Sequence, residues 1–177
     1  MVGVFRPLHL LKFRVRAKSG CGVGFDCSRI SGLWMTRGWF EWETDGWPCW
    51  SHLSNVQSWW NFRDLPNIQL IHYADMLEDT EREIRRIAAF LEIDVPASRW
   101  ADIVNAVSFT EMKRQGEFYA PAGGQFWKGG AETFLHKGTN GRWRDILSNE
   151  EMALYDAACE RALTPECRAW LESGGAV

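Results

Sequence analysis

Basic side chains and glycines gather late in the chain, in the segment Phe134-Leu-His-Lys-Gly-Thr-Asn-Gly-Arg-Trp-Arg144. Glycine lets a backbone approach a ligand closely, and the N–H groups of that backbone then act together with the nearby cations. This combination suits an oxyanion such as a phosphate. The segment therefore indicates an anion site, and the alternative is a solvated basic loop without a ligand.

A strand–turn–helix unit is predicted upstream of this segment. Apolar residues at helical spacing predict a helix over residues 51–63, with Ser51 as its cap. Residues 68–72 form a short apolar run typical of a buried parallel strand. Tyr73-Ala-Asp-Met is the expected turn into a helix capped by Asp79 or Thr80. The core face of that helix is expected to consist of Ile84, Ile87, Ala88 and Leu91.

Further helices are predicted between the turn and the end of the chain. One covers residues 98–107, and the pattern S-x-x-E at Ser108 opens a short helix through Met112. Residues 115–142 are rich in glycine and predict a long loop, which in a compact domain is usually functional or disordered. A second S-x-x-E at Ser148 opens a helix to about residue 162, and Thr164-Pro165 opens the last one.

Composition limits the class of protein. The chain has 177 residues, 46% of them hydrophobic and 24% charged, with a net charge of -3. These values fit one globular domain or a large piece of one, and they exclude a collagen or a coiled coil. A pI near 5.8 without a run of lysines or arginines argues against a nucleic-acid binder. We expect no membrane association and a cytoplasmic location, because no long apolar span or secretory signal occurs. The five cysteines form no CxxC pair, so no metal site is predicted.

Charge is distributed unevenly along the chain. Residues 1–37 carry a net charge of +6 and the remainder carries -9. This asymmetry predicts a boundary. Residues 1–37 are expected to be an atypical basic N-terminal segment outside the fold, and residues 38–177 a partial domain.

Tryptophan is unusually frequent, with 11 residues in the chain. Large aromatic side chains are most often core residues, so we expect a core role for the cluster between residues 34 and 60. A platform for a sugar or an aromatic ligand is the alternative. The members of this cluster are Trp34, Trp39, Trp42, Trp47, Trp50, Trp59 and Trp60.

Several segments, taken together and in order, resemble the PAPS-dependent sulfotransferase family, whose members transfer a sulfuryl group from 3′-phosphoadenosine 5′-phosphosulfate (PAPS). The family signature R-K-G-x-x-G, followed by Asp or Arg, Trp and a basic residue, is similar to residues 136–144. The W-W helix, the strand and the Y-x-D turn of the family resemble Trp59-Trp60, residues 68–72 and Tyr73-Ala-Asp75. The E-I-x-x-I-A-x-F-L helix and the S-F-x-x-M-K element resemble residues 83–91 and 108–113.

The resemblance implies the C-terminal part of a P-loop-like, three-layer α/β sulfotransferase fold, mostly helical in this chain. It implies PAPS as sulfuryl donor, without a metal, and a small molecule with a hydroxyl or amine as acceptor. His136, Lys137 and Gly138 would hold the 3′-phosphate of the donor. The residues that would surround the adenine are Tyr73, Ser108, Phe109, Met112 and Phe134.

The N-terminal part departs from the family pattern. Only Lys18-Ser19-Gly20 is similar to the P-K-S-G-T-T-W loop that holds the 5′-phosphosulfate, and no catalytic base is found. Catalytic residues therefore stay unassigned, activity stays open, and we expect the chain to be truncated. One alternative is a non-enzymatic remnant with residual nucleotide binding, and another is an aromatic-rich interaction module. Helix faces left without partners predict self-association.

Overall fold

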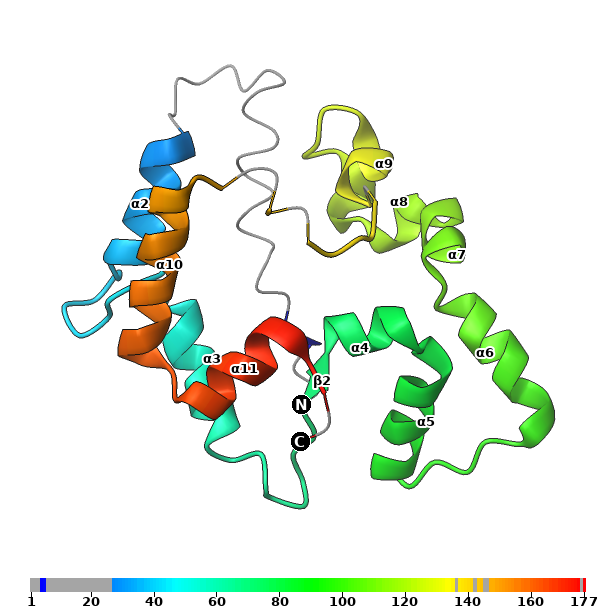
Figure 1. Cartoon of the computed structure of the whole chain (residues 1–177). Coiled ribbons are helices and arrows are strands. Elements are labelled where there is room, and N and C mark those ends of the chain that lie inside the picture. The colour runs from blue at the N-terminus through cyan, green and yellow to red at the C-terminus, as the bar shows by residue number, and fades with distance from the viewer. Residues whose placement is uncertain (1–3, 6–26, 136, 142, 145–146, 176) are drawn as a thin grey trace. The chain divides into compact units, whose positions relative to one another are not determined.

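The computed structural model describes residues 4–5, 27–135, 137–141, 143–144, 147–175 and 177. Within these ranges the chain is mostly helical, with one short pair of strands (Figure 1). The elements are β1 (Val4–Phe5), α2 (Cys27–Thr36), α3 (His52–Trp60), β2 (Ile71–His72), α4 (Tyr73–Glu78), α5 (Thr80–Phe90), η1 (Ala97–Arg99), α6 (Trp100–Ala106), α7 (Phe109–Arg114), α8 (Gly116–Tyr119), η2 (Pro121–Gly124), α9 (Gly130–Phe134), α10 (Asn149–Ala162) and α11 (Pro165–Ser173).

The chain divides into two compact units. The first unit consists of Met1–Asp75 and Gly141–Val177, and the second consists of Met76–Asn140. In the first unit α10 packs against α2 and α3, and α11 packs against α3 (Figure 1). Helices from the two ends of the sequence therefore share one core. Its buried members are Leu53, Val56, Trp60, Leu70, Ala158, Cys159, Cys167, Trp170 and Leu171.

Side-chain caps define the starts of these helices as the sequence predicts. Ser51 Oγ accepts a hydrogen bond from the backbone N–H of Ser54 at 3.0 Å, which opens α3. Ser148 and Glu151 form both halves of a capping box at α10. Thr164 caps α11, with Pro165 at the first helical position. Each cap satisfies amide donors that have no partner within the helix.

The predicted strand at residues 68–72 is shorter in the structure. Only Ile71 and His72 form β2, which pairs in parallel with Val4 and Phe5 of β1. A strand extends only as far as a neighbour offers backbone partners, and here the described neighbour is two residues long. The chain direction and the burial of Ile71 still match a parallel-sheet strand.

The basic N-terminal segment lies partly within the described residues. The helix described in this segment, α2, packs against α10, and Trp34 and Met35 are buried. The Trp34 carbonyl accepts a hydrogen bond from the Gly46 N–H at 2.7 Å. Residues 6–26, including Lys18-Ser19-Gly20, lie outside the described residues. The boundary at residue 37 therefore stays a prediction for the segment as a whole.

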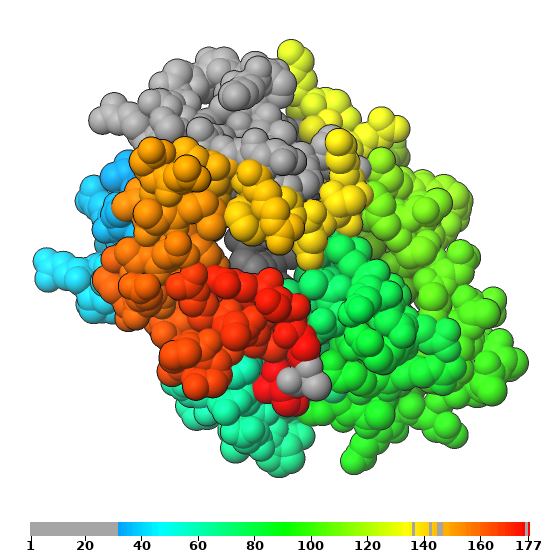
Figure 2. Space-filling view, viewed as in Figure 1, coloured from blue at the N-terminus to red at the C-terminus, as the bar shows by residue number. Residues whose placement is uncertain are grey.

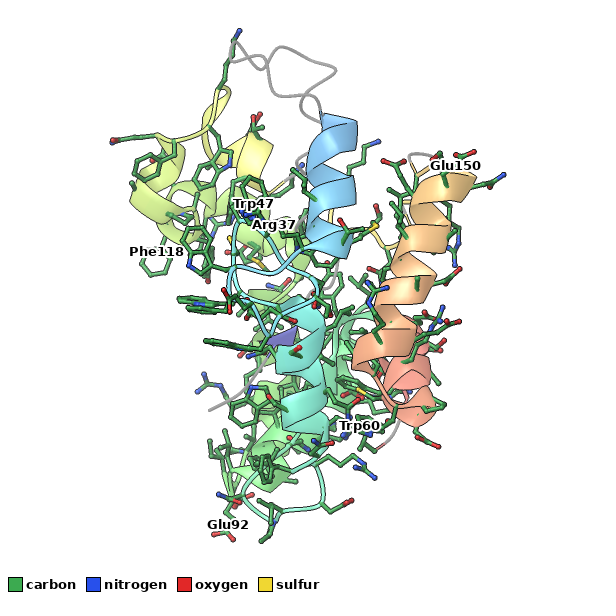
Figure 3. The ribbon with its side chains drawn as sticks, turned by 90° about the vertical axis from the view of Figure 1, so that its left-hand side faces the viewer. Arg37, Trp47, Trp60, Glu92, Phe118 and Glu150 are labelled. Carbon is green, nitrogen blue, oxygen red and sulfur yellow. The ribbon has the colours of Figure 1, made fainter. Side chains whose placement is uncertain are left out.

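The tryptophan cluster divides between core and surface. Trp34 and Trp60 are buried as expected, whereas 60% of Trp39, 77% of Trp42 and 74% of Trp50 is exposed. The expectation of a core role is wrong for these three. They belong to the loop between α2 and α3, where the carboxylates of Glu43 and Asp45 accept hydrogen bonds from other loop residues. Figure 3 shows Trp47 of this loop beside Arg37, whose guanidinium lies 5.7 Å from the indole centroid.

Helix α5 of the second unit begins at its predicted cap, and its predicted core face is only partly buried. Asp79 Oδ1 accepts from the Arg82 N–H at 2.9 Å. Of the predicted apolar face only Ala88 is buried, and 48% of Leu91 is exposed. Glu83 is buried as well, with its carboxylate 2.6 Å from a guanidinium nitrogen of Arg86. The ion pair compensates the charge of the carboxylate and so permits its burial. Hydrophobic periodicity alone cannot predict such a buried residue.

Where it is described, the predicted loop at residues 115–142 contains three short helical elements, α8, η2 and α9. Glycine makes this compaction feasible at Gly124, which has φ of +86°. A Cβ there would lie 2.3 Å from the backbone nitrogen of Ala131. The glycines that predicted a loop therefore permit close backbone packing between η2 and α9.

A core substitution tests the packing of the first unit. Leu53→Ala should lower the free energy of unfolding by about 2–5 kcal/mol, because Leu53 is 1% exposed within the core. Leu65→Ala is the matched control, since 45% of Leu65 is exposed. Urea unfolding followed by circular dichroism measures both. Equal losses in the two variants would contradict the assigned core.

Candidate functional site

Helix α7 carries three of the residues expected to bind a nucleotide base. Ser108 is its N-cap, and its Oγ accepts from the Glu111 N–H at 3.2 Å. The Glu111 carboxylate accepts from Arg114 Nε at 2.8 Å. The hydrogen bond from Arg114, and then the one from Gln115, lowers the pKa of Glu111 to about 2. Glu111 is therefore charged at neutral pH, but Arg114 compensates the charge that would otherwise repel an anion.

Phe109 and Gly138 are in contact within the second unit, although they are far apart in the sequence. Gly138 has φ of +63°, a conformation that favours glycine. A Cβ at this position would lie 2.8 Å from Cδ2 of the Phe109 ring. The aromatic ring therefore packs on the bare backbone of Gly138. This contact joins the start of α7 to the basic segment.

Two lysines border the contact between Phe109 and Gly138. Lys137 precedes Gly138 and its side chain is exposed. Lys113 Nζ lies 5.7 Å from the centroid of the Phe109 ring. Met112 lies one helical turn after Phe109 and is half-buried. An aromatic ring, a thioether and two cations suit a planar base that carries a phosphate.

Phe134 ends α9, shortly before Lys137. Its ring packs against Trp127 with centroids 4.6 Å apart and planes tilted by 50°. Sequence patterns predict a site role for Phe134 but not for Trp127 or Lys113. The spacing of Phe109 and Lys113, four residues apart on a helix, is a signal that identifies Lys113.

Tyr73 belongs to the first unit and begins α4 directly after β2. It is half-buried, and the flanking side chains of His72 and Asp75 are buried. His136 and Arg142 lie outside the described residues, so their predicted roles stay predictions. Arg144, in the first unit, places its guanidinium 4.9 Å from the centroid of the Trp143 ring.

Neither a metal-binding cluster nor a membrane-spanning helix is present among the described residues. No group of three or more His, Cys, Asp or Glu side chains there has an arrangement that suits a metal ion. Among the helices in the same ranges, none has the length and apolar character that crossing a bilayer requires.

Comparisons with known proteins point to the same family as these segments. The family model described as the sulfotransferase domain matches residues 38–166. The match covers well over half of the chain. The chain belongs to the sulfotransferase family.

The relatives found by sequence comparison are also named sulfotransferases. The chain is 27% identical over 115 residues to Sulfotransferase 1A1 of Rattus norvegicus, covering 64% of this chain and 40% of that protein. It is 28% identical over 115 residues to the Glycolipid sulfotransferase of Mycobacterium bovis, covering 65% of this chain and 35% of the relative. The chain thus matches well under half the length of these relatives.

A solved structure shares the fold. The crystal structure of mouse sulfotransferase SULT7A1 complexed with PAP superimposes with a TM-score of 0.65 at 20% identity. The match covers 92% of this chain and 57% of the mouse chain. The predicted fold class, a mostly helical part of the sulfotransferase fold, is confirmed.

Paired glycine substitutions test the contact between α7 and the basic segment. Gly138→Ala should loosen α7, because the new methyl group meets the Phe109 ring. Gly130→Ala is the matched control, since Gly130 has a similar φ of +65° and nothing within 4 Å of a built Cβ. Both variants carry about 1–2 kcal/mol of backbone strain. Hydrogen exchange of residues 108–115 should quicken in Gly138→Ala beyond the control, and equal exchange would contradict the contact.

Proposed function

We propose that this chain forms the 3′-phosphoadenosine-binding part of a sulfotransferase that uses PAPS as donor. Lys137 and the Gly138 backbone bind the 3′-phosphate, together with His136. Ser108, Phe109, Met112, Phe134 and Tyr73 surround the adenine. The acceptor is a small molecule with a hydroxyl or an amine, and its identity stays open.

The observation that carries this proposal is the packing of the Phe109 ring on the Gly138 backbone. A 3′-phosphoadenosine nucleotide presents a planar base and a phosphate a short distance apart. The contact places an aromatic ring beside a backbone without a side chain, with Lys137 adjacent and Lys113 near the same ring. The described residues therefore fit the nucleotide part of the donor.

The role of these residues in transfer is binding and orientation. When bound, PAPS supplies the sulfuryl group. The chain's lysines neutralise the nucleotide's phosphate, and the aromatic side chains exclude water from one face of the base. Such contacts hold one end of the donor, and catalysis also requires groups that orient the reacting sulfuryl and accept a proton. Activity of the chain by itself, truncation of a longer enzyme and a cytoplasmic location stay predictions.

A lysine substitution tests nucleotide binding. Lys137→Ala should weaken binding of 3′-phosphoadenosine 5′-phosphate by about 1–3 kcal/mol, or roughly 5- to 150-fold, because a charge-assisted hydrogen bond is lost. Isothermal titration calorimetry at two salt concentrations measures the affinity. Lys128→Ala, which removes another exposed lysine of the second unit, should leave it unchanged. Absence of binding at millimolar nucleotide, or equal binding by Lys137→Ala, would refute the proposal.

A second candidate function, the aromatic-rich interaction module, is favoured by the loop between α2 and α3. The Phe40 and Trp42 rings stack at 4.6 Å with an interplanar angle of 3°. Glu43 carboxylate oxygens accept from the N–H groups of Trp39, Phe40 and Ser51 and hold this loop. An ordered loop that exposes large aromatic side chains is typical of an interaction surface. We propose that a second copy of the chain binds it.

Sedimentation velocity tests this self-association. The chain should sediment faster as its concentration rises, and Trp42→Ser should reduce the effect because the most exposed member of the stacked pair is lost. Phe62→Ser is the control, since Phe62 is 54% exposed outside this loop. A monomer at every concentration, or equal effects of both substitutions, would remove the second candidate.

A further inference from the structure

The end of α11 and the residues after it are hydrogen-bonded to His72 and Asp75, which flank Tyr73 in the sequence. The Gly175 N–H donates to both carboxylate oxygens of Asp75, at 3.0 Å and 3.2 Å. The Gly175 carbonyl accepts from Trp170 Nε1 at 3.2 Å. We call residues 174–175 the C-terminal turn. In the space-filling view the red end of the chain lies at the surface (Figure 2). The Asp75 side chain, which accepts the hydrogen bonds from this turn, is buried.

His72 forms a second link between the same two segments. Its Nδ1 accepts from the Ala74 N–H at 3.1 Å, so the proton of the neutral ring lies on Nε2. Nε2 then donates to the Leu171 carbonyl at 3.0 Å. The Trp170 ring meets the imidazole edge-on, with centroids 5.3 Å apart. One ring nitrogen of His72 is therefore hydrogen-bonded to the backbone just after Tyr73, and the other is hydrogen-bonded to α11.

Gly174 is required for this approach. Its φ is +76°, and a Cβ would lie 2.5 Å from Asp75 Oδ1 and 2.8 Å from His72 Nδ1. Any side chain at this position would displace the two polar groups that flank Tyr73. The contact therefore depends on a residue without a Cβ.

These bonds are separate from the hydrophobic core. Asp75, His72 and Gly174 are not members of the core cluster, and α11 is already fixed to α3 by Trp170 and Leu171. The polar links consequently act on the junction of β2 and α4, where Tyr73 is located.

We propose that the C-terminal turn is a positioning device for Tyr73. By holding Asp75 and His72 on either side of Tyr73, it sets the orientation of the tyrosine and thereby the affinity for the adenine nucleotide. This inference rests on the proposed nucleotide site. Asp75 and Gly174 act through Tyr73 and do not touch the ligand.

The test uses the three tyrosines of the chain as reporters. The protein is produced with 3-fluorotyrosine, and Tyr73→Phe assigns the Tyr73 signal in the ¹⁹F NMR spectrum. Gly174→Ala and Asp75→Asn disturb the turn in two independent ways. Asp45→Asn is the matched control, because Asp45 is also a buried carboxylate that accepts from a backbone N–H, that of Leu53. Calorimetry with 3′-phosphoadenosine 5′-phosphate is performed on each variant.

We expect both turn variants to shift or broaden the Tyr73 signal while those of Tyr119 and Tyr155 stay in place. Their nucleotide affinity should fall about fivefold or more, the equivalent of one lost hydrogen bond. Lys137→Ala should lower affinity without moving the Tyr73 signal, and Asp45→Asn should alter neither.

An unchanged Tyr73 signal in both turn variants would overturn the inference, and so would a changed signal with unchanged affinity. Failure of the wild-type chain to bind the nucleotide is a different outcome. It would refute the proposed function, while the Tyr73 signal would still decide whether the turn orients the tyrosine.

Discussion

The first unit depends on packing between helices that lie far apart in the sequence. Leu53, Val56 and Trp60 of α3 share one core with residues of α10 and α11. Burial of side chains of this size stabilises a fold by about 1.5–3 kcal/mol each. Because α11 is fixed in this way, its last residues reach the junction of β2 and α4. The hydrophobic contact thus places polar groups beside Tyr73.

Two glycines let distant backbone segments approach side chains closely. The Phe109 ring lies against the backbone of Gly138, and the side chains of Asp75 and His72 lie against that of Gly174. Both have positive φ, so both positions combine a conformational and a steric requirement. The two contacts lie in different units, and each joins a segment late in the chain to one near a proposed adenine residue.

Exposed aromatic side chains are the other consequence of the architecture. Trp39, Trp42 and Trp50 extend from a loop whose conformation is held by polar groups. Asp45, buried at its base, accepts from Ser51 Oγ and from the Leu53 N–H. The loop therefore keeps its shape without burying its aromatic rings. The proposed interface with a second copy uses these rings, and the proposed nucleotide site uses different residues.

Local patterns of the sequence by themselves determined much of this protein. The caps at Ser51, Asp79, Ser148 and Thr164 are formed, since a cap requires only a few consecutive residues. The order of segments also identified the family and the candidate nucleotide residues.

Only the tertiary structure decided the contacts that depend on long-range packing. Periodicity placed Leu91 in the core and overlooked Glu83, because burial is set by neighbouring elements and by ion pairing. The strand has only two residues because pairing depends on its partner. The approaches of Gly138 to Phe109 and of Gly174 to Asp75 join residues far apart in the chain. No local pattern encodes such pairs, since their proximity is produced by the packing of whole helices.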